Sequence, residues 1–327
     1  MMRTILILTV TLPFLTPSFG QVKITPRDGK VVSVEIDGKP FTDFYVGNEG
    51  GALKPYLHPL RSASGKSVTR GFPMLPDVPG EVHDHPHHRG LWFTHGDVNG
   101  LDFWAPEVAK DPNKRGTVVL AKIDKAAGGK KSGEIVATFE WKTPQGKTLL
   151  TETRRMVFYS DPVNRIIDFD ATLRPQEEVK FGDTKEGMFA TRLAAGLEEP
   201  QRRSPAEPKR TGLMVGASGK KGEKEVWGKR AEWVDYAGEL EGEQLGVAIL
   251  DHPANPRHPT WWHSRSYGLF ACNIFGLHDF ENDKSKDGSL TIKPGQPLRF
   301  RYRVVIHPGN FASAGVAEMF QKYAAAK

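Results

Sequence analysis

A long series of short strand-like segments with almost no helix between them is the feature that most constrains the fold of this chain. The segments are rich in β-branched and aromatic residues and are bounded by Gly, Pro or Asp. Parallel strands need long crossover connections, which are usually helices, so the pattern predicts antiparallel pairing. We therefore predict an all-β fold of two large packed antiparallel sheets. The predicted strands are residues 31–36, 41–46, 117–123, 134–141, 148–159, 163–173, 231–236, 244–250, 267–275, 289–292 and 298–307.

One amphipathic helix is predicted, at the C-terminal end of the chain over residues 312–325. Val316, Met319, Phe320 and Tyr323 recur there at i, i+3, i+4 and i+7 and form a single apolar face. We expect this face to pack on the core and not to bind a partner.

A charged segment, residues 198–229, interrupts the series of strands and is rich in Lys, Arg, Glu, Gly and Pro. Such a composition is typical of a linker between domains. Because strand patterns flank the segment on both sides, we expect instead a surface excursion within one domain that covers residues 21–327.

The first twenty residues have the pattern of a secretory signal peptide. Arg3 precedes an apolar run over residues 5–14, and the small residues Ser18 and Gly20 stand at the −3 and −1 positions before Gln21. The apolar run is shorter than the ~20 residues that a membrane-spanning helix needs. We therefore expect removal of residues 1–20, export to the periplasm or beyond, and no membrane span.

Composition disfavours several classes of function. The chain has 45 Lys and Arg against 39 Asp and Glu, with the signs interspersed and no basic arm, so a nucleic acid partner is not expected. It has no phosphate-binding glycine loop, no dinucleotide fingerprint and no GxSxG motif, so a bound nucleotide or flavin is not expected either. The single cysteine, Cys272, lies in an apolar run and is predicted to be a buried small hydrophobic residue.

The densest group of reactive side chains lies in residues 81–104, EVHDHPHHRGLWFTHGDVNGLDFW. This stretch, which we call the histidine segment, contains five of the eleven histidines of the chain. Imidazole titrates near neutral pH and is a common metal ligand, so the segment predicts an enzyme or a binder of polar ligands. The five are His83, His85, His87, His88 and His95.

Spacing suggests how these histidines are used. Pro86 disfavours a helix, and on an extended backbone His83, His85 and His87 share one face, where they could meet a metal ion or a sugar. A divalent metal is therefore the one cofactor that stays open, although no standard zinc spacing is met. We assign His88 a catalytic role. Substrate-binding roles are assigned to Arg89, Trp92, His95, Asp97, Asn99 and Trp104, with the indoles stacking on a sugar ring.

Two further segments add candidates. Within residues 255–276, His263, Arg265 and Tyr267 again have a spacing of two and would face one way on a strand. His263 and Tyr267 are predicted to be catalytic, and Arg265 and Trp262 to bind substrate. Within residues 181–192, Glu186 is the carboxylate that we assign as the partner of the histidines, although a solvated charged turn would have the same pattern.

These motifs resemble those of an exported bacterial family that is labelled methane oxygenase PmoA. The resemblance rests on residues 81–104, on TKEGMFATR at 184–192, on HPTWWHSRSYGLFACNIFG at 258–276 and on the closing SLTIKPGQPLRFRYRVVIHPG. The membrane-bound methane oxygenase subunit has several spanning helices, which this chain lacks after residue 20, so the label does not imply methane oxidation here.

The pattern Leu290-x-Ile292-x-Pro294-Gly295 before the last strand is similar to the end of galactose-mutarotase-like proteins. That resemblance implies a two-sheet supersandwich and a superfamily of sugar epimerases, polysaccharide lyases and glycoside hydrolases. It specifies no reaction.

The leading hypothesis is an exported carbohydrate-active enzyme, a hydrolase, lyase or epimerase, that acts on a sugar or glycoside by proton transfer between histidine and a carboxylate or tyrosine. Arg89 and Arg265 would hold a carboxylate or developing negative charge. The alternatives are a sugar-binding module without catalysis and a histidine-ligated metal enzyme or oxygenase. We also expect one cleft to bring together side chains of the two segments, namely His83, His85, His87, His88 and Arg89 with His263, Arg265 and Tyr267.

Overall fold

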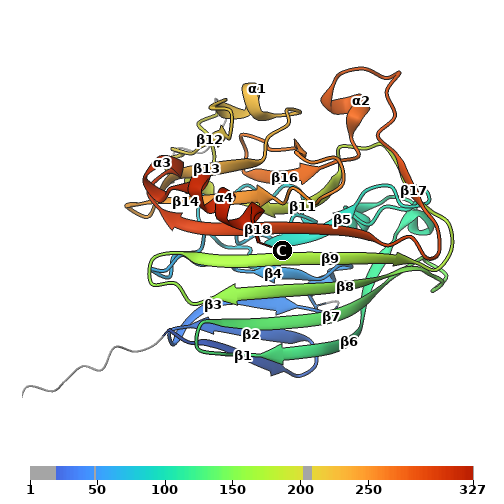
Figure 1. The fold of residues 1–327 in the computed structure, drawn as a ribbon, viewed down its shortest axis with the longest axis horizontal. Helices are drawn as coiled ribbons and strands as arrows, with labels where there is room; N and C mark the ends of the chain where they lie inside the picture. The colour runs from blue at the N-terminus through green and yellow to red at the C-terminus, as the bar shows by residue number, and fades with distance from the viewer. Residues whose placement is uncertain (1–19, 48, 202–207, 327) are drawn as a thin grey trace, which may run out of the picture.

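A computed structural model describes residues 20–47, 49–201 and 208–326. The predicted signal peptide therefore lies outside the described residues, except for Gly20. Two eight-stranded antiparallel sheets dominate the described chain, which confirms the predicted fold class (Figure 1). The first sheet has the order β1 (Val22–Arg27), β2 (Val31–Ile36), β3 (Lys39–Tyr45), β4 (Tyr56–His58), β5 (Leu91–His95), β11 (Gly187–Arg192), β16 (Leu269–Asn273) and β15 (Trp261–Trp262).

The second sheet contains the longest strands. One of them, β8, covers residues 148–159, as predicted. Along β7 and β9 of this sheet, buried and partly exposed side chains alternate, so every second side chain enters the core. The order is β12 (Leu213–Gly216), β13 (Trp233–Leu240), β14 (Glu243–Asp251), β18 (Leu298–Pro308), β9 (Arg165–Pro175), β8 (Thr148–Tyr159), β7 (Ser132–Lys142) and β6 (Thr117–Ala127). A small separate sheet pairs β10 (Val179–Phe181) with β17 (Leu290–Ile292).

The inner faces of the two large sheets share one aromatic-rich core. Phe93 of β5 lies in this core, with ring centroids 5.5 Å from those of Phe169 on β9 and Phe300 on β18. Cys272 is fully buried in the same core, as expected. The opposite face of the first sheet carries a separate cluster that includes Trp92 and Ala190.

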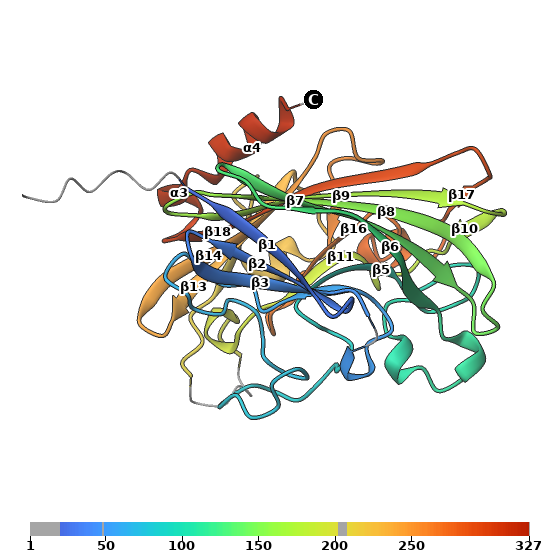
Figure 2. The ribbon, with the colours of Figure 1, turned by 90° about the horizontal axis from the view of Figure 1, so that it is seen from below.

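The predicted C-terminal helix is divided in two by Gly315, which has a left-handed φ of 69°. Val316, Phe320 and Tyr323 are buried, and Met319 packs beside them, so the predicted apolar face is confirmed. Figure 2 shows α4 on the outer side of the second sheet. The helices are α1 (Gly222–Val226), α2 (Leu277–Phe280), α3 (Phe311–Ala314) and α4 (Val316–Ala324), with short 3-10 turns at Glu49–Gly51, Pro106–Val108, Pro112–Lys114 and Ala195–Leu197.

The predicted excursion at residues 198–229 is more structured than a surface loop. It contributes β12, the edge strand of the second sheet, and the short helix α1, and both Glu198 and Glu199 are buried. Residues 202–207 of this segment lie outside the described residues. Among the described residues, no helix is long and apolar enough to span a membrane.

Long connections cover the face of the first sheet that points away from the second sheet. In Figure 2 they run below the sheet in blue to teal. These connections include the histidine segment, and they form the candidate site with residues 184–186 and with the turn that leads into β16.

Candidate functional site

A cavity of about 410 Å³, lined by both polar and aromatic side chains, lies over the outer face of the first sheet. Four stretches of chain line it. They are residues 85–88, residues 96–105, residues 184–186 and residues 263–269, which include the turn between β15 and β16. Its volume falls in the range of small-molecule sites. The lining residues are His85, His87, His88, Gly96, Asp102, Trp104, Ala105, Thr184, Lys185, Glu186, His263, Arg265, Tyr267 and Leu269.

The histidine segment enters the cavity through a tight turn and not as the extended chain that we predicted. His85 has a φ of +44°, and the His88 backbone N–H donates to the His85 carbonyl at 2.9 Å. Gly90, with a φ of +52°, then leads into β5, and a Cβ there would lie 2.0 Å from the Leu57 carbonyl oxygen. Only glycine can make this approach, so it directs the segment onto the sheet.

The turn removes the predicted shared face of His83, His85 and His87. His83 stacks on Phe72, with ring centroids 4.5 Å apart, and does not line the cavity. His85 and His87 do line it, with ring centroids 5.6 Å apart.

The two predicted motifs converge in a stack of four rings. The Tyr267 and His85 centroids are 5.6 Å apart, those of His85 and His88 are 4.7 Å apart, and those of His88 and Trp92 are 5.3 Å apart. The first two pairs are parallel within 7°. Residues 263–267 reach the stack through a hairpin turn closed by the Arg265 N–H and the Leu269 carbonyl at 2.7 Å, and not along a continuous strand.

Hydrogen bonds to the inner nitrogens set opposite tautomers for the two predicted catalytic histidines. Arg192 Nη1 lies 3.2 Å from His88 Nδ1. Because a guanidinium only donates, His88 Nδ1 accepts and Nε2 carries the hydrogen. His263 Nδ1 lies 2.8 Å from the Lys185 carbonyl oxygen, which only accepts, so Nδ1 carries the hydrogen and Nε2 keeps its lone pair.

Burial keeps these imidazoles neutral. It is the largest cause of the fall in the pKa of His87 to about 3 and of His263 to about 4, and it holds the pKa of His88 well below its usual value. In a desolvated site the charged form of an imidazole is disfavoured. The cavity therefore presents neutral hydrogen-bond donors and acceptors near neutral pH.

Two carboxyl groups complete the lining. Burial raises the pKa of Glu186, and Lys185 Nζ, 3.5 Å from Glu186 Oε1, partly opposes this rise. Burial also raises the pKa of Asp102, whose Oδ1 accepts from the Trp104 and Ala105 N–H groups at 2.8 Å. Both groups are shifted towards the form that can donate a proton.

Asp102 and Lys54 belong to the candidate site, although the sequence alone gave neither of them a role. Lys54 is fully buried beneath the cavity, where its Nζ donates to the Trp104 carbonyl and lies 3.4 Å from Glu107 Oε2. Burial lowers its pKa. A lysine within the apolar stretch GALKPYL was the available sequence signal.

The predicted sugar-stacking role finds no exposed indole face, because the four candidates Trp92, Trp104, Trp261 and Trp262 are all buried. Trp92 and Trp104 are each only 1% exposed and pack on His88 and on each other. Trp262 lies in the core between the sheets, where its Nε1 donates to the Ala231 carbonyl at 3.0 Å. It therefore cannot contact a ligand in the cavity.

Four other predicted binding residues do not line the cavity. His95 is fully buried against Phe275, and its Nε2 bonds the Gly182 carbonyl at 2.8 Å. Arg89 donates to the Gly50 carbonyl at 2.8 Å. Asp97 accepts from the Gly100 N–H and Asn99 pairs with the Lys180 backbone, so both shape the turn after β5.

The donor arrangement does not fit the metal ion that the sequence left open. Among the described residues, no group of three or more His, Cys, Asp or Glu side chains is placed to hold one. His83, the first of the three predicted ligands, stacks on Phe72 and does not line the cavity. We therefore derive no step through a metal.

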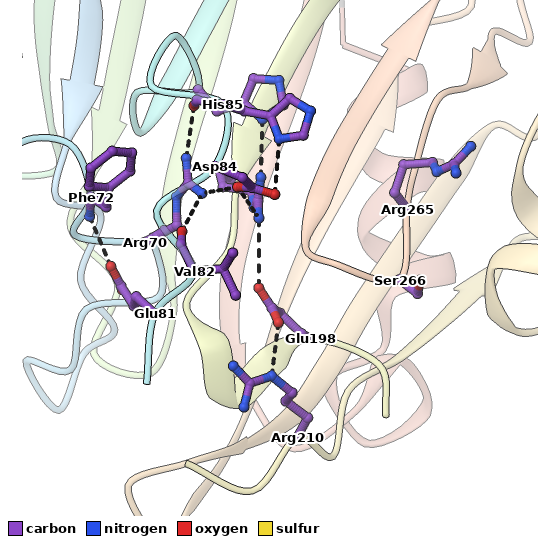
Figure 3. Close-up of polar contacts among 12 residues, drawn as sticks. Arg70, Phe72, Glu81, Val82, Asp84, His85, Glu198, Arg210, Arg265 and Ser266 are labelled. Carbon is purple, nitrogen blue, oxygen red and sulfur yellow. Dashed lines mark hydrogen bonds and ion pairs between the residues drawn. The ribbon is translucent and has the colours of Figure 1, made fainter. Parts of the chain in front are cut away.

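A network of ion pairs between arginine and carboxylate side chains holds the histidine segment in place (Figure 3). Asp84 Oδ1 accepts from Arg70 Nη1 at 2.6 Å and lies 3.0 Å from Arg192 Nη2. Glu198 lies 3.9 Å from Arg192 and 3.0 Å from Arg210. The network joins residues 70–84 to residues 192–210, two regions that are far apart in sequence.

Fold and site together define an all-β protein of two packed sheets with a histidine- and carboxylate-lined cavity on one outer face. The chain belongs to a family of unknown function, DUF6807, whose sequence profile matches residues 31–321. This match lends no support to the methane oxygenase PmoA label. A search of curated proteins finds no match.

Solved structures with distant similarity include sugar-related proteins. A galactose mutarotase related enzyme from Lactobacillus acidophilus is 8% identical with a TM-score of 0.35, covering 88% of this chain and 97% of its own. A galactose mutarotase-like protein from Lactobacillus casei is 9% identical with a TM-score of 0.39, covering 88% and 100%. An alpha-galactosidase of family GH36 from Geobacillus stearothermophilus is 11% identical with a TM-score of 0.34, covering 89% and 40%. At such low scores we base the function on this chain's own residues.

Proposed function

We propose that this protein is an exported carbohydrate-active enzyme that binds a sugar or glycoside in the cavity and catalyses proton transfer on it. The observation that carries the proposal is the pair of fixed, opposite tautomers. His88 offers Nε2–H as a donor and His263 offers Nε2 as an acceptor, and both line one cavity with Glu186. Hydroxyl groups both donate and accept, so a polyhydroxylated ligand matches such a lining.

The chemistry follows from these states. His263 accepts a hydrogen bond from a substrate hydroxyl, and the neutral His88 donates to an oxygen that gains negative charge. Glu186, with its raised pKa, is suited to protonate a ring or glycosidic oxygen. Arg265 and Tyr267 line the same cavity, and burial raises the pKa of Tyr267 to about 12, so its phenol remains a neutral donor. Export rests on the signal-peptide pattern of residues 1–20.

The test is a screen of the purified protein against a panel of glycosides that includes oxidised and uronic-acid sugars, with binding measured beside turnover. On any substrate found, we expect His88→Ala, His263→Ala and Glu186→Gln each to lower kcat by about 10²- to 10⁴-fold, the usual contribution of a positioned acid or base. Thermal melts separate a loss of chemistry from a loss of fold, because the side chains of His88 and His263 are buried and hydrogen-bonded.

His83→Ala is the matched control, since His83 belongs to the same segment but stacks on Phe72 outside the cavity. It should retain wild-type kcat. Wild-type turnover in all three cavity variants would contradict the proton-transfer roles. If the protein binds a sugar but turns over none, it is a sugar-binding module and not an enzyme.

A further inference from the structure

We propose that His85, oriented by Asp84, is the general base of this cavity, a role that rests on the proposed function and deepens it. The sequence assignments used His85 only as a possible contact to a metal ion or a sugar and gave Asp84 no role. Asp84 Oδ2 lies 3.0 Å from His85 Nδ1, and Asp84 Oδ1 is held by two arginines. The pair is thus a carboxylate–imidazole dyad whose ring borders the cavity.

Both oxygens of Asp84 have fixed partners, which settles the direction of the imidazole bond. Oδ1 receives Arg70 Nη1 at 2.6 Å and Arg192 Nη2 at 3.0 Å, so Oδ2 remains for His85. An ionised carboxylate only accepts, so His85 Nδ1 carries a hydrogen and Nε2 keeps its lone pair. Arg70 also donates to the His85 and Val82 carbonyls, at 3.0 and 3.1 Å, which clamps the backbone of the turn (Figure 3).

The surroundings keep Asp84 charged. Burial alone would raise its pKa, but the hydrogen bond from His85 and the charges of Arg192 and Arg70 hold this pKa well below its usual range. The side chains of both arginines are only 1% exposed. Buried guanidinium groups are costly unless paired, so the two arginines and the carboxylate stabilise one another.

His85 differs from the other imidazoles of the cavity in two respects. His87, His88 and His263 are buried, whereas 41% of the His85 side chain is exposed. It is also the one lining histidine, among the described residues, that has an ion-pair contact with a carboxylate. The titratable and charged groups around its ring are Asp84, His87, His88, Arg70, Arg192, Glu186 and Tyr267.

The proton balance is simple. His85 Nε2 gains the proton that a substrate O–H or acidic C–H loses, and the Asp84 carboxylate stabilises the resulting imidazolium. Glu186 loses the proton that a sugar oxygen gains. Exchange with water, or the reverse transfer, restores both groups.

The test combines kinetics with histidine ¹⁵N NMR. His85→Gln should lower kcat by about 10²- to 10⁴-fold and remove the acidic limb of the kcat/KM profile. Asp84→Asn should shift that limb to lower pH, because the imidazolium loses its counter-charge. In the wild-type spectrum, the signals that disappear in His85→Gln should report the Nδ1–H tautomer.

His278→Gln is the matched control. His278 forms a comparable pair with Asp183, at 2.6 Å and with 33% of its side chain exposed, but it does not line the cavity. Its variant should keep the wild-type profile. If Asp84→Asn fails to fold because the arginines lose their partner, His85→Gln still decides the question.

The outcomes separate the two proposals. A wild-type protein that neither binds nor turns over any glycoside contradicts the proposed function, and the tautomer of His85 then tests the dyad alone. An Nε2–H form of His85 would overturn the dyad whatever the activity. An active wild type with an unchanged pH profile in His85→Gln would overturn it while leaving the proposed function intact.

Discussion

At the scale of single residues, Arg192 connects two imidazoles that have different tasks. Its Nη1 lies 3.2 Å from His88 Nδ1, its Nη2 lies 3.0 Å from Asp84 Oδ1, and its guanidinium lies 4.7 Å from the Tyr267 ring centre. Only the planar fork of an arginine can donate along these separate directions. Arg192 is thus a positioning residue for both His88 and the carboxylate beneath His85.

Arg192→Lys tests this role. The ammonium cannot serve both acceptors, so we expect His88 to lose its fixed tautomer and kcat to fall with a smaller change in KM. The checks are the histidine ¹⁵N shifts and steady-state kinetics on the substrate that the screen returns. A single Nε2–H tautomer of His88 in this variant would contradict the assignment.

At the scale of strands, β8 carries an ion pair into the core between the sheets. Glu152 and Arg154 are two residues apart on the inner face, with Glu152 Oε1 and Arg154 Nε 2.6 Å apart and the exposed fractions of the two side chains at 0% and 1%. Trp141 on β7 donates from Nε1 to Glu152 Oε2 at 2.9 Å. The guanidinium of Arg154 lies 5.0 Å from the Phe139 ring centre, so the pair is desolvated and depends on its own partners.

Removing one member should cost far more than removing both. Glu152→Ala should lower the free energy of unfolding by about 3–5 kcal/mol, because it leaves a buried charge without a partner. The double variant Glu152→Leu, Arg154→Met should show a smaller loss in the free energy of unfolding, because no unpaired charge remains in the core. Denaturant unfolding of the three proteins checks the order.

The neighbouring Arg155 provides the control. It points outward from the same strand and pairs with Glu134 at the surface, with 52% of its side chain exposed. Arg155→Ala should cost about 0–1 kcal/mol. An equal loss in Glu152→Ala and Arg155→Ala would show that the buried pair has no special dependence on its partner.

At the scale of the whole molecule, stability couples to pH through histidines that folding buries in their neutral form. His95 is fully buried between Phe181 and Phe275, and burial lowers its pKa to about 4 against an ordinary value of 6.5. The unfolded chain therefore binds a proton between these pH values that the folded chain does not bind. By linkage, the contribution of His95 is complete above pH 6.5 and is lost as the pH falls towards 4.

We expect this loss to amount to about 3 kcal/mol for His95 alone, since one pKa unit corresponds to about 1.4 kcal/mol. His95→Gln removes the titration while keeping an amide where Nε2 bonds Gly182. The difference in unfolding free energy between wild type and variant, measured from pH 7.5 to 4, should shrink by this amount. A constant difference would contradict the buried neutral state. Gln in place of the exposed His83 should follow the wild-type curve.

The sequence by itself determined most of the longer strands, the antiparallel pairing and the apolar face of α4, because alternation and helical periodicity are local patterns. It did not predict the shorter or edge strands β1, β4, β10, β12 and β15. The sequence also predicted that the segments around His88, Glu186 and His263 contribute to one candidate site, because such a density of polar groups is rare on apolar strands, and these residues line one cavity.

Only the tertiary structure decided which side chains meet. A spacing of two states that residues share a face of an extended chain, but not whether that face points into the core or towards a cavity. Composition likewise did not show that Trp262 lies in the core between the sheets. The left-handed φ of His85 broke the expected alignment of its neighbours and separated His83 from the cavity. The bond between Asp84 and Arg192 joins a loop to a strand about a hundred residues later, and no local pattern encodes such a contact, because it exists only once the sheet has brought the two segments together.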